Sequence, residues 1–169
     1  HTCTAKSRDW GKDLYEDLVA PTVGDGLKAE TWRDGSGGRL PSFCTASNGS
    51  DSAHAVDYDV LAVNLVTMPD GTSWKGTADH SRWAVTSSSS VGTACIGDIN
   101  RFCSQESRGG GTLCLKDSGL WQAMSDAVTA TDPCWDYDVC NQQSTQCYWC
   151  GEVGRGIEPR SSQLRRAFV

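Results

Sequence analysis

The sequence predicts an α/β fold, with α+β as the alternative, in which a mixed sheet is flanked by helices. Segments with the four-residue apolar spacing of helices occur at 9–20 and 119–128. Between them lie short runs rich in β-branched and aliphatic residues, bounded by Gly, Pro, Asp and Ser, as is typical of strands. This mixing of strands and helices favours one of the two mixed classes. At 169 residues the chain is long enough for one domain with its own core.

The first helix is predicted over residues 9–20. Within it Trp10, Leu14 and Leu18 recur every four residues and therefore share one face. Pro21 follows, and because proline lacks a backbone donor, we expect the helix to stop there.

The second helix is predicted over residues 119–128, with Ser118 as its N-cap. Its apolar face carries Leu120, Met124, Ala127 and Val128. Strands are predicted at 27–32, 58–67, 80–86 and 93–101, with further extended pieces around Trp74 and before Cys114, and with turns or polar loops at 34–38, 45–55, 69–71 and 87–90.

The nine cysteines predict disulfides and an oxidising compartment. The one Cys-x-x-Cys, at 147–150, has no second pair at zinc-finger distance and no histidine nearby, so we expect no metal site. Asn48 begins an Asn-Gly-Ser glycosylation acceptor, which is consistent with secretion. A chain that starts at His1, just before Cys3, is interpreted as processed, and no run is apolar enough to span a membrane.

The net charge of −6 is opposite to the usual footprint of a nucleic-acid-binding protein. It disfavours tight DNA binding at neutral pH. In an acidic compartment carboxylates become protonated and the balance moves toward positive, so charge alone does not exclude a nucleic-acid substrate. The seven tryptophans are compatible with core anchors, which we favour, or with a large interface.

Polar side chains two residues apart mark the candidate site. Strand alternation predicts that His80 and Arg82 point the same way, and likewise Asp98 and Asn100. If the two strands are neighbours, an imidazole, a guanidinium, a carboxylate and an amide share one surface. This set suits phosphodiester chemistry, in which an imidazole attacks or shuttles protons while cationic and amide donors hold phosphate oxygens.

Three motifs, at residues 79–83, 95–101 and 108–114, resemble the C-terminal half of the deoxyribonuclease II family, the acid DNases. Residues 11–15 and 40–44 fit the same pattern. The resemblance runs from about Ser7 to Cys134, so we expect a C-terminal half-domain over 1–134. Residues 135–169 then form a cysteine-rich, basic extension whose arginines we expect to be solvated surface and not a DNA contact.

The resemblance implies a phospholipase D-like superfold, in which two similar α/β halves form an active site at their junction. In that superfold each half supplies a His-x-Lys pair and a downstream polar residue. One histidine attacks phosphorus and the other protonates the leaving oxygen, with no metal or other cofactor. The family's products end in a 3′-phosphate, and the enzymes work at acid pH in lysosomes or secretions. The chain would be one half of such a pseudo-two-fold enzyme.

Residue by residue, the resemblance makes His80 a catalytic histidine, and Arg82 stands where the family has a lysine. Asn100 would bind phosphate or orient a histidine. Asp98 departs from the superfold's serine but agrees with the acid DNases, and it is also compatible with pairing to Arg101 or Arg82.

Arg101 and Arg108 are the expected substrate-binding cations. Arg108 with the glycines at 109–111 suits a backbone nest for phosphate or a plain turn. The resemblance also implies the disulfides Cys44–Cys134 and Cys95–Cys114. It leaves Cys3, Cys103, Cys140, Cys147 and Cys150 unassigned, so one of them is available to link another chain.

One histidine cannot be nucleophile and simultaneous general acid. The other two histidines, His1 and His54, are terminal or in a polar loop, so the chain carries half a site. We expect the other half from an N-terminal half chain of the same precursor, disulfide-linked or not, or from a second copy in a homodimer. The predicted function is a secreted or lysosomal acid endodeoxyribonuclease acting on DNA. The alternatives are a catalytically impaired secreted protein acting as a toxin, binding or structural protein, and a phospholipase D-like lipid hydrolase.

Overall fold

A computed structural model describes residues 1–35, 38–45 and 57–134 of the chain. The predictions for Asn48, His54, the loop at 45–55 beyond Thr45 and the extension at 135–169 lie outside the described residues. None of the described helices is both long and apolar enough to cross a membrane.

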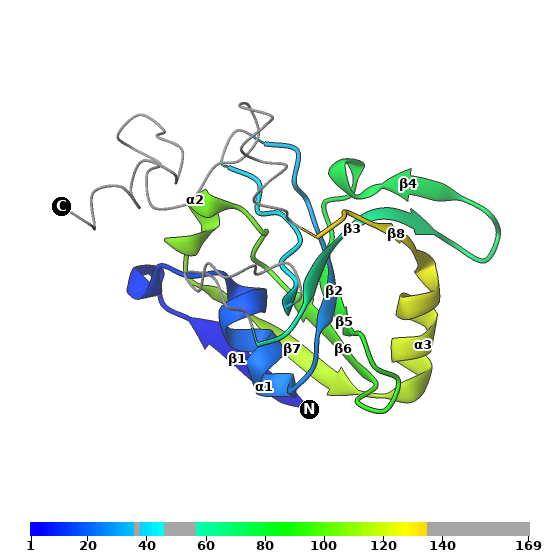
Figure 1. The fold of residues 1–169 in the computed structure, drawn as a ribbon, viewed down its shortest axis with the longest axis horizontal. Coiled ribbons are helices and arrows are strands. Elements are labelled where there is room, and N and C mark those ends of the chain that lie inside the picture. Colours follow the sequence, from blue (N-terminus) through cyan, green and yellow to red (C-terminus); the bar gives the residue numbers. More distant parts are fainter. Residues whose placement is uncertain (36–37, 46–56, 135–169) are drawn as a thin grey trace.

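The described residues form a mixed eight-stranded sheet in the order β1-β7-β6-β5-β2-β3-β4, with β8 paired to β3 (Figure 1). The strands are β1 (Thr2–Lys6), β2 (Leu27–Thr31), β3 (Val60–Thr67), β4 (Ser73–Lys75), β5 (Arg82–Thr86), β6 (Thr93–Gly97), β7 (Gly110–Lys116) and β8 (Val128–Thr131). Strands β2 and β3 run parallel, and the other strand pairs in the described part are antiparallel. The predicted α/β class is confirmed.

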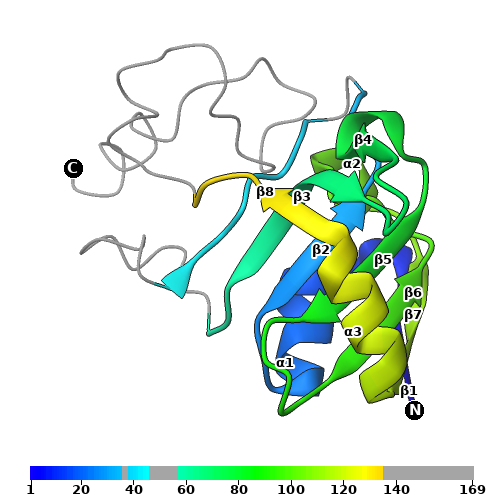
Figure 2. The same cartoon turned by 90° about the vertical axis from the view of Figure 1, so that its right-hand side faces the viewer.

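Short helical segments accompany the sheet. They are η1 (Arg8–Trp10), η2 (Tyr15–Val19), α1 (Ala20–Val23), η5 (Gly76–Ala78), α2 (Cys103–Glu106) and α3 (Ser118–Ala127). The segments η2 and α1 lie on one face of the sheet and α3 on the other (Figures 1 and 2).

The first predicted helix is wrong in both of its limits. Residues 8–10 form a separate turn that ends at Gly11, and the continuous helical stretch begins at Tyr15. Pro21 does not stop it: Pro21 lies next to the first residue of α1, and the fixed φ of proline is compatible with a helix at this point. Gly24 ends the stretch instead, in the left-handed conformation at φ 70°.

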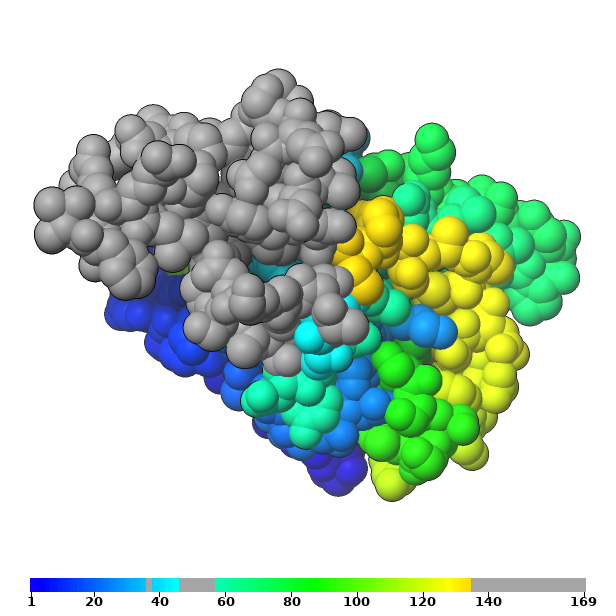
Figure 3. All heavy atoms as spheres, viewed as in Figure 1, coloured from blue at the N-terminus to red at the C-terminus, as the bar shows by residue number. Residues whose placement is uncertain are grey.

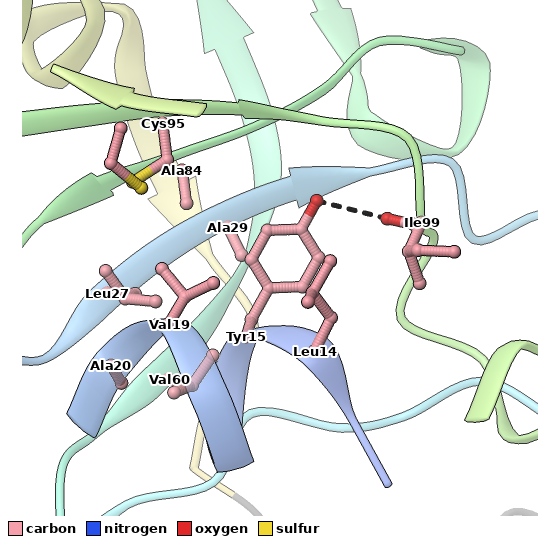
Figure 4. Close-up of a cluster of buried hydrophobic side chains, with 11 residues drawn as sticks. Leu14, Tyr15, Val19, Ala20, Leu27, Ala29, Val60, Ala84, Cys95 and Ile99 are labelled. Carbon is pink, nitrogen blue, oxygen red and sulfur yellow. Dashed lines mark hydrogen bonds between the residues drawn. A yellow bond between two sulfur atoms is a disulfide. The ribbon is translucent and has the colours of Figure 1, made fainter. Parts of the chain in front are cut away.

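The main core lies between the sheet and the stretch of η2 and α1. The register places Ala29, Ala84, Cys95 and Cys114 in one row across four neighbouring strands. Tyr15 and other apolar residues of the helical stretch pack onto this row (Figure 4). Burial of such apolar surface is the main force that stabilises the fold.

The opposite face is covered by α3. Trp121 packs against Val85 and Ala94, and its Nε1 donates to the carbonyl of Thr86 at 2.8 Å. The N-cap of α3 is Asp117, whose carboxylate accepts from Leu120 N at 2.8 Å, and not the predicted Ser118. Figure 3 shows α3 and β8 beside the β3–β4 hairpin on the described surface.

Both disulfides that the resemblance implies are present. Cys95–Cys114 joins β6 to β7 inside the main core, and Cys44–Cys134 ties the end of β8 back to the segment before β3. Cys103 is also disulfide-bonded, so among the cysteines that the structure describes Cys3 is the free thiol.

Three carboxyl groups are held in surroundings that favour their neutral form. Burial raises the pKa of Glu30 and of Glu16 to about 8 and that of Glu106 to about 7, against an ordinary value of 4.5. Glu30 is fully buried, and neither of its carboxylate oxygens accepts a hydrogen bond within the described residues.

These shifts predict that the fold is more stable at pH 5 than at pH 8. Between pH 4.5 and about 8 the folded state keeps protons that the unfolded chain has lost, so the free energy of unfolding falls as pH rises. Glu30→Gln should flatten this dependence when thermal unfolding is followed across that range. Asp70→Asn is the control. Hydrogen bonds from Thr72 lower the pKa of the exposed carboxyl of Asp70, so this group does not titrate within that pH range. An unchanged slope in Glu30→Gln would contradict the prediction.

The pairing of β1 with β7 predicts a second effect on stability. A Cβ at Gly111 would overlap the carbonyl of Thr4 and lie 3.0 Å from the Cα of Ala5, both of them backbone atoms of β1. Gly111→Ala should therefore lower the free energy of unfolding, by roughly 1–3 kcal/mol in urea denaturation. At Gly109 the nearest atom that a Cβ would meet is Arg8 N at 3.5 Å, an ordinary van der Waals contact, so Gly109→Ala should have a much smaller effect.

Candidate active site at one edge of the sheet

The candidate residues gather where four neighbouring strands begin or end. Thr31, at the end of β2, pairs with Arg82, at the start of β5. The end of β6 likewise lies beside the start of β7. The antiparallel order therefore brings the predicted site segments, residues 80–82, 98–101 and 108–111, to the same end of these strands. This region is called the site edge below.

Strand alternation does not orient the site as predicted. His80 precedes β5, which begins at Arg82, and Asp98 and Asn100 follow β6, which ends at Gly97. Their positions are set by side-chain contacts and turns at the ends of the strands. The expected set of groups nevertheless lies at one edge.

His80 is exposed, and its imidazole is stacked on the indole of Trp32, with 4.5 Å between ring centroids and 30° between ring planes. The turn before it is fixed by Asp79, whose carboxylate accepts from Ser81 N at 2.8 Å and from Trp74 Nε1 at 2.9 Å. Burial raises the pKa of Asp79, but these hydrogen bonds outweigh it and leave the pKa below its ordinary value.

Arg82 and Asn100 form a directly bonded pair. Arg82 Nε donates to Asn100 Oδ1 at 2.7 Å, and Asn100 is buried while Arg82 is half-buried. This contact uses the carbonyl oxygen of the Asn100 amide. The polar atoms of the two side chains that are left for other partners are therefore all donors: Nη1 and Nη2 of Arg82 and Nδ2 of Asn100. None of them bonds to a residue that the structure describes. A cluster of donors of this kind suits an anion with several oxygens.

Asp98 has neither of its expected arginine partners among the described residues. Its carboxylate accepts from Gly111 N at 2.8 Å, while its own N–H donates to Gly111 O at 3.3 Å. A Cβ at Gly110 would overlap Asp98 and Ile99. Since Gly111 N is already bonded and Gly110 lies in β7, these glycines fit a close strand junction better than a phosphate nest.

The two expected substrate-binding arginines differ. Arg108 is exposed near the site edge, where its Nη1 donates to Gln105 Oε1 at 3.3 Å. Arg101 has no exposed surface: its Nε lies 3.7 Å from Asp13 Oδ1 and its Nη2 lies 4.0 Å from Glu16 Oε2. Arg101 is therefore placed to hold the fold together and not to contact DNA.

Sequence reasoning missed three residues beside the site. Trp32 was assigned only to the end of a strand, yet its ring covers His80. Tyr15 is buried, which raises its pKa, and it donates to Ile99 O at 3.0 Å, just before Asn100 (Figure 4). Lys6 ends β1 at the same edge but donates to carbonyls at the end of α2. The signal available in the sequence was an aromatic residue, Trp32, at the end of a predicted strand.

Within the described ranges, no group of three or more His, Cys, Asp or Glu side chains is arranged to hold a metal ion. The groups that the site edge presents are an exposed imidazole and, beside it, a cluster of amide and guanidinium donors.

Sequence comparison identifies a matching family and several relatives of this chain. The family model described as Deoxyribonuclease II matches residues 1–134. Plancitoxin-1 of Acanthaster planci is 40% identical over 129 residues, which cover 76% of this chain and 33% of that protein. Deoxyribonuclease-2-alpha of Sus scrofa is 37% identical over 130 residues, covering 77% and 33% respectively. A putative deoxyribonuclease-2 of Burkholderia pseudomallei is 37% identical over 129 residues, covering 76% and 34%.

The chain thus spans about a third of the length of these relatives, and the matched part contains every residue of the site edge. On the extent of the family match and the similarity of these relatives, the chain belongs to the deoxyribonuclease II family.

Proposed function

We propose that the chain supplies the C-terminal half of an acid endodeoxyribonuclease site, which hydrolyses DNA without a metal and leaves 3′-phosphate ends. The observation that carries the proposal is the Arg82–Asn100 pair, whose remaining groups are donors, at the same edge as His80. Membership of the deoxyribonuclease II family supports DNA as the substrate.

The proposed reaction has two steps. In the first, a neutral imidazole forms a bond to phosphorus while the bond to the 5′ oxygen breaks, and a second, protonated imidazole gives its proton to that oxygen. In the second step, the imidazole that gave up its proton takes a proton from water. The water oxygen then attacks phosphorus, which breaks the bond between phosphorus and the first histidine and releases a 3′-phosphate. His80 takes one of these two roles.

The donors at the site edge would lower the barrier to both steps. A phosphodiester anion repels a nucleophile, and negative charge stays on its non-bridging oxygens as the bond to the imidazole forms. The guanidinium of Arg82 and the amide of Asn100 would hold those oxygens and orient phosphorus for in-line attack. Arg108 would add positive charge where the rest of the DNA passes.

The second histidine would come from outside these 169 residues. His1 lies next to Thr2, at the end of β1 opposite the site edge, and His54 is outside the described residues. Because the chain spans about a third of its relatives' length, we propose a partner equivalent to their N-terminal half, disulfide-linked or not, with a second copy of this chain as the alternative. The chain with this partner is called the full assembly below. Its proposed location is secreted or lysosomal, in agreement with the disulfides.

A second candidate is a secreted family member with impaired catalysis, acting as a toxin or as a binding or structural protein. The observation that favours it is Arg82 at the position where the resemblance places a lysine. A relative that is 40% identical bears the name Plancitoxin-1.

The nuclease proposal predicts that the full assembly nicks plasmid DNA at about pH 5 in EDTA, leaving ends that a 3′-phosphatase must treat before a polymerase can extend them. His80→Ala should abolish nicking, because no other imidazole in the described residues lies at the site edge. His1→Ala is the matched control and should keep full activity. Non-reducing against reducing electrophoresis of the same sample identifies the partner chain. No cleavage by the unsubstituted assembly would rule out the nuclease.

Arg82→Lys distinguishes the two candidate functions. A lysine ammonium carries its three N–H donors on one nitrogen, so it cannot contact Asn100 Oδ1 and at the same time present to phosphate the planar pair of Nη donors that Arg82 offers. If Arg82 is the working cation, Arg82→Lys should lower kcat by about tenfold, and by less when Asn100→Ala is already present. Arg8→Lys, at an exposed arginine with no assigned role, is the control. A rise in kcat on Arg82→Lys would instead support the impaired protein.

A further inference from the structure

We propose that Trp32 is a positioning residue for His80: its indole fixes the orientation of the imidazole for in-line reaction at phosphorus. The inference rests on the proposed nuclease function and adds to it a residue that touches the histidine and not the phosphate.

The first argument is the shortage of other restraints on the histidine. His80 is exposed, lies in the link between η5 and β5, and forms no hydrogen bond with any of the described residues. The backbone turn is fixed through Asp79, but that contact leaves the torsions of the His80 side chain free. The stack on Trp32, at 4.5 Å between centroids, is the contact that limits ring orientation.

The second argument is the geometry of the stack. With 30° between the planes, the indole covers a face of the imidazole. Both ring nitrogens lie in the imidazole plane, at its edge. Stacking therefore restricts the side chain without occupying the nitrogen that must attack phosphorus or carry a proton. A hydrogen-bonded restraint would occupy one of the two nitrogens.

The third argument is that Trp32 is itself held in place. It follows the last residue of β2, and its ring packs against buried Phe102 at 6.4 Å between centroids with 55° between planes. Phe102 N donates to Asn100 O at 3.0 Å. Two aromatic contacts in series, His80–Trp32 and Trp32–Phe102, therefore connect the imidazole to the segment that carries the phosphate-binding amide. Such a connection helps to keep the distance between the imidazole and the phosphate constant, whichever of the two roles His80 takes.

The test compares Trp32→Phe and Trp32→Leu in the full assembly, with Trp10→Leu as the control for loss of a half-buried indole elsewhere. Initial rates on an oligonucleotide duplex give kcat and KM. Trp32→Leu should lower kcat roughly 10- to 100-fold with KM changed less than about twofold, because the phosphate donors remain. Trp32→Phe should keep an intermediate kcat, and Trp10→Leu should match the unsubstituted protein.

A spectroscopic measurement separates positioning from a general loss of structure. The ring protons of His80, assigned by their absence in His80→Ala, should lie upfield in the NMR spectrum of the unsubstituted protein, because the indole ring current acts on them. They should move downfield in Trp32→Leu and part of the way in Trp32→Phe, in parallel with kcat. If Trp32→Leu does not fold, the Phe variant alone decides.

Two outcomes would overturn the inference. The first is a downfield shift in either variant with an unchanged kcat, since the stack would then be lost without consequence. The second is a loss of rate through KM alone, which would assign Trp32 to substrate binding. If the unsubstituted assembly cleaves no DNA, the nuclease function itself fails and this role fails with it, whereas the first two outcomes leave the nuclease function standing.

Discussion

The buried guanidinium of Arg101 is the constraint on which the site edge depends. A buried charge is costly unless it is paired, and Arg101 lies at ion-pair distance from Asp13 and Glu16 while its Nη1 donates to the carbonyl of Val60 at 3.5 Å. Burial makes the carboxyl of Glu16 neutral below about pH 8, so Asp13 is the nearer and more effective partner. These contacts join the helical stretch, β3 and the segment after β6 at one point, which sets where that segment can run.

The neighbours of Arg101 are positioned by the same contact. Its backbone N–H donates to Thr31 Oγ1 at 3.2 Å, which holds the segment against the end of β2. With the side chain of Arg101 turned into the core, Asn100 on one side meets Arg82 and Phe102 on the other meets Trp32. Three consecutive residues thus make three different contacts. Arg101 pairs with Asp13 in the core, Asn100 accepts from Arg82, and Phe102 packs against Trp32, the residue that stacks on His80. Sequence reasoning gave Arg101 a part in binding because it could not distinguish a buried arginine from an exposed one.

The parts of the fold that the sequence predicted are those in which local pattern and tertiary packing agree. The run at 58–67 is apolar enough to require burial, and it forms β3. Residues 2–6 alternate only weakly, with the small apolar residues Cys3 and Ala5 between polar ones, so β1 was not predicted; β7 offers it a partner edge whose glycines allow close approach. Segments 80–86 and 93–101 were predicted as strands that contain the site, but the polar residues lie just beyond the strand ends, where hydrogen bonds and stacking decide orientation. The residue types of the site were therefore predictable, whereas its geometry was not.

The net charge of −6 is a poor guide to the site edge, and the structure explains why. The carboxylates closest to the site are engaged internally: Asp98 accepts from a backbone N–H of β7, and Asp79 accepts from Trp74 and Ser81. A carboxylate that accepts backbone and indole donors is partly neutralised, and it competes less for the nearby guanidinium. Arg82 is consequently bonded to a neutral amide in place of a carboxylate, and its remaining donors stay available for an anion. An acidic chain can in this way present a local surface that receives phosphate, because what decides recognition is which charges are already satisfied within the fold.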